Sequence, residues 1–114
     1  MAAPREADIQ RACLQYLHLI GWHVWRNNTG ATRATDTRGK ARFIRYGSPG
    51  SADILGVTPR GQFLAVELKR PGNKPTELQA EWLERVRKSG GLAIVATSLD
   101  ELRSQLRQSG YDVS

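Results

Sequence analysis

Cysteine and histidine are scarce in this chain of 114 residues, which contains one cysteine, Cys13, and two histidines. A single cysteine excludes a disulfide framework within the chain, and so few thiol and imidazole groups exclude zinc-finger ligation. Long apolar runs are also absent, so no segment is expected to cross a bilayer. The first residues carry acids and lack the apolar stretch of a signal peptide. These absences predict a cytoplasmic protein without a membrane partner.

The length and composition are those of a single small domain over residues 1–114. Hydrophobic residues make up 39% and charged residues 25% of the chain, which is typical of a folded, water-soluble domain. The chain is too short for a TIM barrel. It can bury only a modest core, and dimerisation would be an easy way to enlarge that core.

Acidic residues are few relative to basic ones, 11 against 17, which gives a net charge of +6. Such a balance in a small domain favours a polyanionic partner, with nucleic acid as the first candidate. Most of the excess lies in residues 26–47, where six cations meet one acid, Asp36. We expect a mobile basic loop here, followed by a strand near Arg42–Tyr46; a merely solvated loop is the alternative. The candidate DNA-binding residues in this segment are Arg26, Arg33, Arg38, Lys40, Arg42 and Arg45.

Hydrophobic periodicity and turn signals predict a mixed α/β order, α-β-β-β-β-α-β-α. Two apolar strands flank the turn Thr58–Gly61, which predicts a hairpin. Because a strand–helix–strand unit follows the hairpin, we expect a central mixed sheet flanked by helices. Ser98 and Glu101 have the spacing of a capping box at the last helix. The predicted helices span residues 4–20, 76–89 and 98–108, and the predicted strands span 22–26, 42–46, 52–57, 62–68 and 92–96.

Three charged residues stand in or beside the apolar hairpin: Asp53, Glu67 and Lys69. Glu67 and Lys69 are two residues apart in a strand, so their side chains point to one face of the sheet. If the turn is centred near Arg60, Asp53 lies opposite Glu67, with Cβ atoms roughly 5 Å apart. This placement depends on the register, because a one-residue bulge would move Asp53 elsewhere.

Two carboxylates at such a distance repel each other unless a cation lies between them. Oxygen ligands suit Mg²⁺ or Mn²⁺, and such an ion would polarise a phosphoryl oxygen and acidify a coordinated water. Lys69 would then stabilise charge on the phosphate or orient the attacking water. The alternative is an ordinary exposed strand pair of Glu67 and Lys69, with Asp53 as a turn cap.

The run GSADILG at residues 50–56, followed by VELK at 66–69, resembles the PD-(D/E)xK nuclease superfamily. More narrowly, the whole chain resembles a virus-type replication–repair nuclease (VRR-NUC) domain. The supporting segments are the leading helix with Glu6, WRNNTGA, GSPGSADILG, ELKRPGNKPTELQAEWL and GGLAIVATSLDEL. The chain departs from the superfamily signature at Ala52, where the signature has proline.

This resemblance implies the restriction-endonuclease-like fold and hydrolysis of DNA with Mg²⁺ (or Mn²⁺). It implies that Asp53 and Glu67 are catalytic metal ligands, joined by the Leu68 carbonyl and by Glu6, with Lys69 as catalytic lysine. It further implies a homodimer that cuts branched DNA, such as four-way junctions or flaps, in the cytosol of a bacterium or a phage-infected host.

Two of the implied site residues have structural alternatives. Gln79 matches a catalytic glutamine of the superfamily, but Thr76 and Gln79 also have the spacing of a capping box. Glu6 could simply favour the positive end of the first helix. Arg70 and Lys74 flank the proposed site and are placed to contact the scissile strand of the DNA.

Two other functions fit the same sequence. One is a non-catalytic nucleic-acid-binding domain of the same fold; the intact Asp53, Glu67 and Lys69 argue against it. The other is a nuclease that acts on RNA, although no RNA-binding signature is present. A role in base stacking for Trp22 or Trp25 is weaker than packing, and Cys13 is expected in the core.

Overall fold

A computed structural model describes residues 4–28 and 30–114, and the side chains of residues 30–34 and 43–46 lie outside the described set. The three helices found in these residues are α1 (Glu6–Leu19), α2 (Glu77–Lys88) and α3 (Leu99–Gln108). The strands are β1 (His23–Arg26), β2 (Gly30–Thr35), β3 (Ala41–Tyr46), β4 (Ile54–Val57), β5 (Phe63–Leu68) and β6 (Leu92–Ala96). None of these helices is long and apolar enough to cross a membrane.

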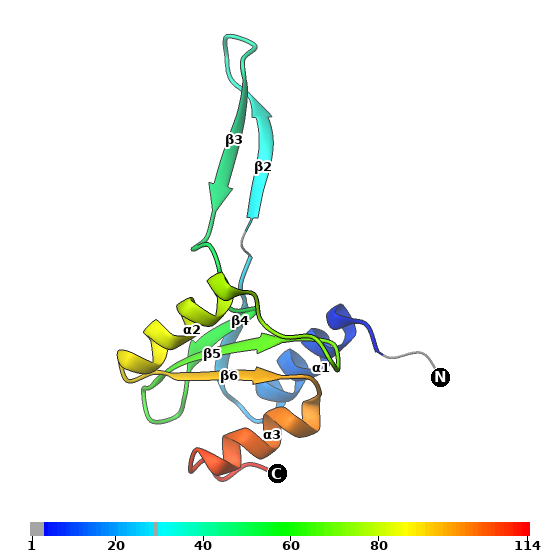
Figure 1. Ribbon diagram of the computed structural model, residues 1–114. Helices are drawn as coiled ribbons and strands as arrows, with labels where there is room; N and C mark the ends of the chain where they lie inside the picture. Colours follow the sequence, from blue (N-terminus) through cyan, green and yellow to red (C-terminus); the bar gives the residue numbers. More distant parts are fainter. Residues whose placement is uncertain (1–3, 29) are drawn as a thin grey trace.

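Four strands form the central mixed sheet, in the order β1-β4-β5-β6 (Figure 1). β4 pairs antiparallel with both β1 and β5, and β5 pairs parallel with β6. A parallel pair needs a long crossover connection, which α2 provides between β5 and β6. The predicted mixed sheet flanked by helices is therefore confirmed.

The helices cover the two faces of the sheet unequally. α1 and α3 pack on one face, where Leu17 and Leu102 meet Leu64 in the main core. α2 lies on the other face, where Leu83 packs on Ala65 and Ala93. Because successive strand residues point to opposite faces, β5 sends Leu64, Val66 and Leu68 to the main core and Phe63, Ala65 and Glu67 to the α2 face.

Local signals explain the ends of α2 and α3. At α2, the Thr76 side chain accepts from the Gln79 N–H, and the Thr76 N–H donates to the Gln79 side chain. At α3, the Ser98 hydroxyl accepts from the Glu101 N–H, as expected. The reciprocal bond predicted for Ser98 and Glu101 does not form, because the Glu101 carboxylate accepts from the Thr97 hydroxyl at 3.1 Å instead.

The basic segment differs from the prediction, since the expected loop before residue 42 contains the strand β2. β2 and β3 pair antiparallel as a separate two-stranded sheet. Asp36 organises the turn between them by accepting hydrogen bonds from the N–H groups of Arg38 and Lys40, each at 2.9 Å. Residues 30–35, GATRAT, lack the apolar alternation that indicates a strand, which is why the sequence predicts a loop here.

This β2–β3 hairpin, residues 30–46, forms an arm that projects away from the central sheet (Figure 1). Within the described part of the chain, β2 and β3 contact each other extensively but make no comparable contact with another helix or strand. The arm adds length to the molecule, whose longest dimension is 55 Å. The fold of the central sheet therefore does not depend on the arm.

Replacing residues 30–46 with a short glycine–serine link is expected to leave the domain folded. An isolated two-stranded hairpin is marginally stable at best, so the melting temperature should change by no more than about 4 °C, the equivalent of about 1 kcal/mol. Thermal unfolding followed by circular dichroism measures this change. A much larger decrease, or loss of the cooperative transition, would show that the arm supports the core.

Candidate metal and phosphate site

The hairpin β4–β5 brings Asp53 and Glu67 together at one end of the sheet. The residue pairs run from Val57 with Phe63 to Ile54 with Val66, and the same register continued by one residue places Asp53 opposite Glu67. The Asp53 carboxylate also accepts a hydrogen bond of 2.8 Å from the N–H of Leu68. The predicted register, with no bulge between the two acids, is confirmed.

Burial separates this group from an ordinary surface pair. Glu67 is 1% exposed and Lys69 is 9% exposed, while Asp53 is partly buried. Surface charges of a strand would be solvated, and burying such charges is costly unless they are paired. The alternative of an exposed Glu67–Lys69 pair is therefore wrong.

The Glu67 carboxylate lacks a full set of partners. Its Oε2 atom is buried and has no hydrogen-bond partner among the described residues. Burial, with smaller contributions from the neighbouring Asp53 and Glu6, raises the pKa of Glu67 from 4.5 to about 9, although the charge of Lys69 acts in the opposite direction. In the absence of a cation, this carboxyl group therefore keeps its proton at neutral pH.

The backbone of β5 also presents an oxygen to this site. The Lys69 N–H donates to the Ala96 carbonyl of β6 at 3.0 Å. The N–H and C=O groups of neighbouring strand residues alternate in direction, so those of Leu68 point to the opposite side, toward Asp53. The Leu68 carbonyl is therefore on the side of β5 where the two carboxylates lie.

Asn27 fixes the other side of Asp53, which sequence reasoning did not identify. Its backbone N–H donates to the Asp53 carbonyl at 2.8 Å. Its side-chain amide donates to the Ser51 hydroxyl at 2.7 Å and to the Ala52 carbonyl at 2.9 Å. These three bonds connect the end of β1 to the segment that carries Asp53. They join residues more than 20 positions apart, so no local pattern predicts them. The only signal in the sequence is the motif WRNN, which contributes to the family resemblance.

Glu6 and Gln79 are placed less directly. Glu6 lies close enough for its charge to raise the pKa of Glu67. However, the described residues contain no cluster of three or more Asp, Glu, His or Cys side chains arranged to hold a metal. The Gln79 side-chain oxygen serves the capping box with Thr76, as the structural alternative expected. Metal ligation by Glu6 and a catalytic role for Gln79 stay predictions.

The predicted DNA-binding cations divide between the arm and the site. Arg38, Lys40 and Arg42 are exposed on the arm, and Arg42 lies 3.6 Å from the Asp36 carboxylate. The side chains of Arg33 and Arg45 fall outside the described set. Arg26, at the end of β1, and Arg70 and Lys74, in the loop after β5, are all exposed.

The donor set at this end of the sheet fits a hard divalent cation. It offers two carboxylates and a backbone carbonyl, which are the ligands that Mg²⁺ and Mn²⁺ prefer. The unpartnered Oε2 atom of Glu67 is the specific observation that favours such an ion, because a buried acceptor without a partner costs about 1–3 kcal/mol. A cation would satisfy that atom and relieve the repulsion between Glu67 and Asp53.

Comparison with known proteins agrees with this architecture. The family model described as the VRR-NUC domain matches residues 5–100. A solved structure titled "VRR_NUC domain" has a TM-score of 0.63 and 24% sequence identity, and the match covers 93% of this chain and 97% of that one. A search of the curated proteins finds no match.

The raised pKa of Glu67 predicts a pH-dependent stability. Between pH 4.5 and about 9 the folded state binds more protons at Glu67 than the unfolded state does, so the free energy of unfolding should fall as pH rises. Glu67→Gln lacks this group, so its stability advantage over wild type should grow with pH to about 1–2 kcal/mol. Urea titrations at pH 5, 7 and 9 without divalent ions measure the difference. Parallel curves for the two proteins would contradict the buried, unpaired carboxyl group.

Proposed function

The chain belongs to the VRR-NUC domain family, a nuclease-type domain, and we propose that it is a Mg²⁺- or Mn²⁺-dependent endonuclease that hydrolyses phosphodiester bonds in DNA. The observation that carries the proposal is the buried Glu67 carboxylate, which faces Asp53 and has an unpartnered oxygen. A structural role does not explain why β5 would bury such a group at the end of a sheet.

In this proposal the carboxylates of Asp53 and Glu67 and the carbonyl of Leu68 hold the ion. When bound, the ion would polarise a phosphoryl oxygen and lower the pKa of a coordinated water. Asn27 and the Leu68 N–H orient Asp53 through their hydrogen bonds. Glu67 would hold the ion in its deprotonated form, since metal ligands must be deprotonated.

Lys69 supplies the positive charge beside the carboxylates. It follows Glu67 by two residues and lowers the pKa of Glu67 through its charge. It makes no ion pair with Asp53 or Glu67 among the described residues. Its ammonium group is therefore free to stabilise negative charge that develops on the phosphate or to orient the attacking water.

We propose DNA of branched shape as the substrate and a homodimer as the active form, acting in the cytosol. The projecting arm supports a substrate that extends beyond the carboxylates, because it carries exposed cations away from the central sheet (Figure 1). Phosphate contacts of this kind hold DNA in position without reading its sequence. Arg26, Arg70 and Lys74 would contact the backbone nearer the site.

The direct test is cleavage of labelled DNA by the purified protein. Linear duplex, single-strand, splayed-arm and four-way-junction DNA would each be incubated with Mg²⁺, Mn²⁺ or EDTA. We expect cutting only with a divalent ion, and a loss of about 100-fold or more in Lys69→Ala, the usual effect of removing one transition-state donor. Lys88→Ala, which removes an exposed cation of the same type at the end of α2, serves as the matched control.

Binding without cutting under every metal condition would overturn the enzyme and leave a non-catalytic DNA-binding domain. Cutting of RNA in preference to DNA would correct the substrate. Calorimetric titration of Mn²⁺ into wild type and Glu67→Ala measures metal binding separately from cleavage. Glu67→Ala should lose cleavage because it no longer binds the ion. Retained metal binding in Glu67→Ala would place the ion elsewhere.

The contribution of the arm to DNA binding is measured by salt dependence. Each phosphate contact contributes about 0.9 to the slope of log K against log salt for duplex DNA. Arg38→Ala with Lys40→Ala should therefore lower that slope by about 2. Fluorescence anisotropy in EDTA at four salt concentrations gives the slopes. An unchanged slope would show that the arm does not contact phosphates.

A further inference from the structure

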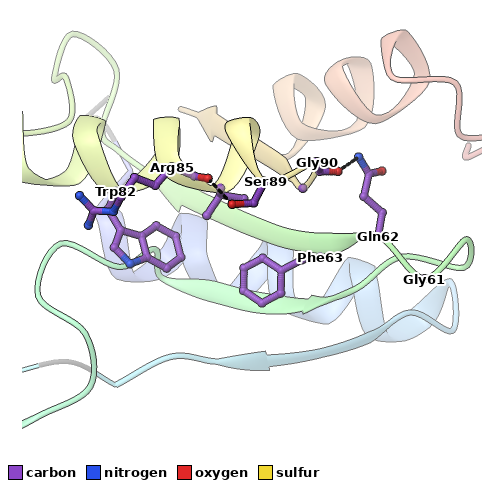
Figure 2. A pocket seen from close by; sticks show the side chains of 9 residues that line it. Gly61, Gln62, Phe63, Trp82, Arg85, Ser89 and Gly90 are labelled. Atoms are coloured by element: carbon purple, nitrogen blue, oxygen red, sulfur yellow. Dashed lines mark hydrogen bonds between the residues drawn. The ribbon is translucent and has the colours of Figure 1, made fainter.

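A groove on the α2 face of the sheet is lined by residues that belong neither to the proposed metal site nor to the arm. It has a volume of about 440 Å³ and lies between the start of β5, the second half of α2 and the turn after α2. Figure 2 shows this groove from close by, with the Phe63 ring beneath the helix and Trp82 and Arg85 toward one end. The carboxylates of the proposed metal site are at the opposite end of β5.

Two aromatic rings give the groove its apolar surface. Phe63 is 41% exposed at the first position of β5. Trp82 is partly buried, and its indole N–H donates to the Ser48 hydroxyl at 3.2 Å, which fixes the ring. Neither ring closes the groove. Exposed aromatic faces held by a rigid scaffold are surfaces on which planar groups stack.

The neutral polar groups of the groove are already engaged within the protein. The Gln62 amide donates to the Gly90 carbonyl at 3.0 Å, and its oxygen accepts from the Tyr111 hydroxyl at 2.7 Å. The Ser89 hydroxyl donates to the Arg85 carbonyl at 2.9 Å. The groove therefore offers no free neutral side chain among these to read the edge of a bound base.

Arg85 is the charged group of the groove. Its side chain is exposed and makes no ion pair or hydrogen bond among the described residues. By contrast, Arg87 on the same helix lies 3.6 Å from Glu84 and donates to the Ala93 carbonyl. A guanidinium group left free beside two aromatic rings is suited to a phosphate or to stacking on a base.

We infer that this groove binds unpaired nucleotides of a single DNA strand, with bases on Phe63 and Trp82 and a phosphate on Arg85. The inference rests on the proposed function for the identity of the occupant, and it adds a binding site for the unpaired part of a branched substrate. Because only rings and a cation are available, binding should tolerate any base sequence, as in other stacking platforms.

The position of the groove fits a strand that also reaches the carboxylates. Phe63 and Glu67 point to the same face of β5, and four residues of strand separate them by about 13 Å. One strand of B-form DNA covers that distance in about four nucleotides. Leu83 of α2 covers Ala65 between these two positions, so a strand that occupies the groove would reach Asp53 and Glu67 by passing beside α2, on the same side of the sheet.

Charge favours nucleic acid over a second copy of the chain in this groove. The Arg85 side chain has no partner among the described residues, so a polyanion in the groove neutralises its charge. A symmetric pairing of two copies through this groove would instead bring their Arg85 side chains close together. Protein interfaces also use the neutral polar groups of the surface for hydrogen bonds, and those of the groove are already engaged. A second copy is the competing occupant that the experiment must recognise.

The test measures binding of a fluorescein-labelled dT 12-mer by anisotropy in EDTA, which prevents cutting. Phe63→Ala should raise the dissociation constant about 10-fold, the usual cost of one lost base stack. Phe63→Tyr, which keeps a ring, should bind like wild type. Arg85→Ala should also weaken binding, whereas Lys88→Ala, the charge-matched change outside the groove, should differ less. A dA 12-mer should give the same order of variants.

Several outcomes would overturn the inference. One is an equal loss of affinity in Phe63→Ala for the dT 12-mer and for a duplex, because the rings would then not be recognising unpaired bases. Another is sedimentation equilibrium showing that Phe63→Ala dissociates a dimer, which would assign the groove to a second copy. Anisotropy in EDTA measures strand binding without metal. Its failure is therefore distinguishable from failure of the proposed nuclease activity, which is shown by absence of cutting in wild type.

Discussion

The position of Glu67 is the constraint on which the site depends. A carboxylate 1% exposed, opposite Asp53, is unfavourable unless something stabilises its charge. The rest of the sheet holds both acids in place regardless. β5 is fixed by hydrogen bonds to β4 on one side and β6 on the other, and Asp53 is fixed by the Leu68 N–H and by Asn27. The backbone therefore cannot move to separate the two carboxylates. Their repulsion is removed only when one of them is protonated or when a cation binds between them.

The two faces of β5 explain how a chain of this length supports such a site. Its even-numbered residues, Leu64, Val66 and Leu68, fill the core under α1 and α3 and hold the strand in place. On the other face, Ala65 packs under Leu83 of α2, while Phe63 in the groove and Glu67 at the carboxylates are available for other roles. The proposed chemistry and the proposed strand binding thus share one strand, and the core on the opposite face stabilises both.

The sequence was sufficient for those parts of the structure that depend on short spacings. The symmetry of Asp53 and Glu67 about the turn predicted their register, which the pairing of Ile54 with Val66 confirms. The capping box of Thr76 and Gln79 was also recognisable. β2 is not predictable in this way because its residues, GATRAT, show no apolar alternation. The bonds of Asn27 and the groove of Phe63 and Trp82 join distant segments, so they depend on how α2 and β1 pack on the sheet rather than on local pattern.

Electrostatic interactions link the two carboxylates, the exposed cations and the proposed metal ion. When both are ionised, Asp53 and Glu67 repel a DNA phosphate as well as each other. The arm, Arg70 and Lys74 can draw DNA to the surface, but their charges are exposed and screened by salt, so they cannot offset two partly or fully buried acids. A cation between Asp53 and Glu67 would do so, since it satisfies Glu67 and presents positive charge to the phosphate. In the proposed function, ion and phosphate should therefore favour each other's binding, and the burial of Glu67 is what makes that coupling strong.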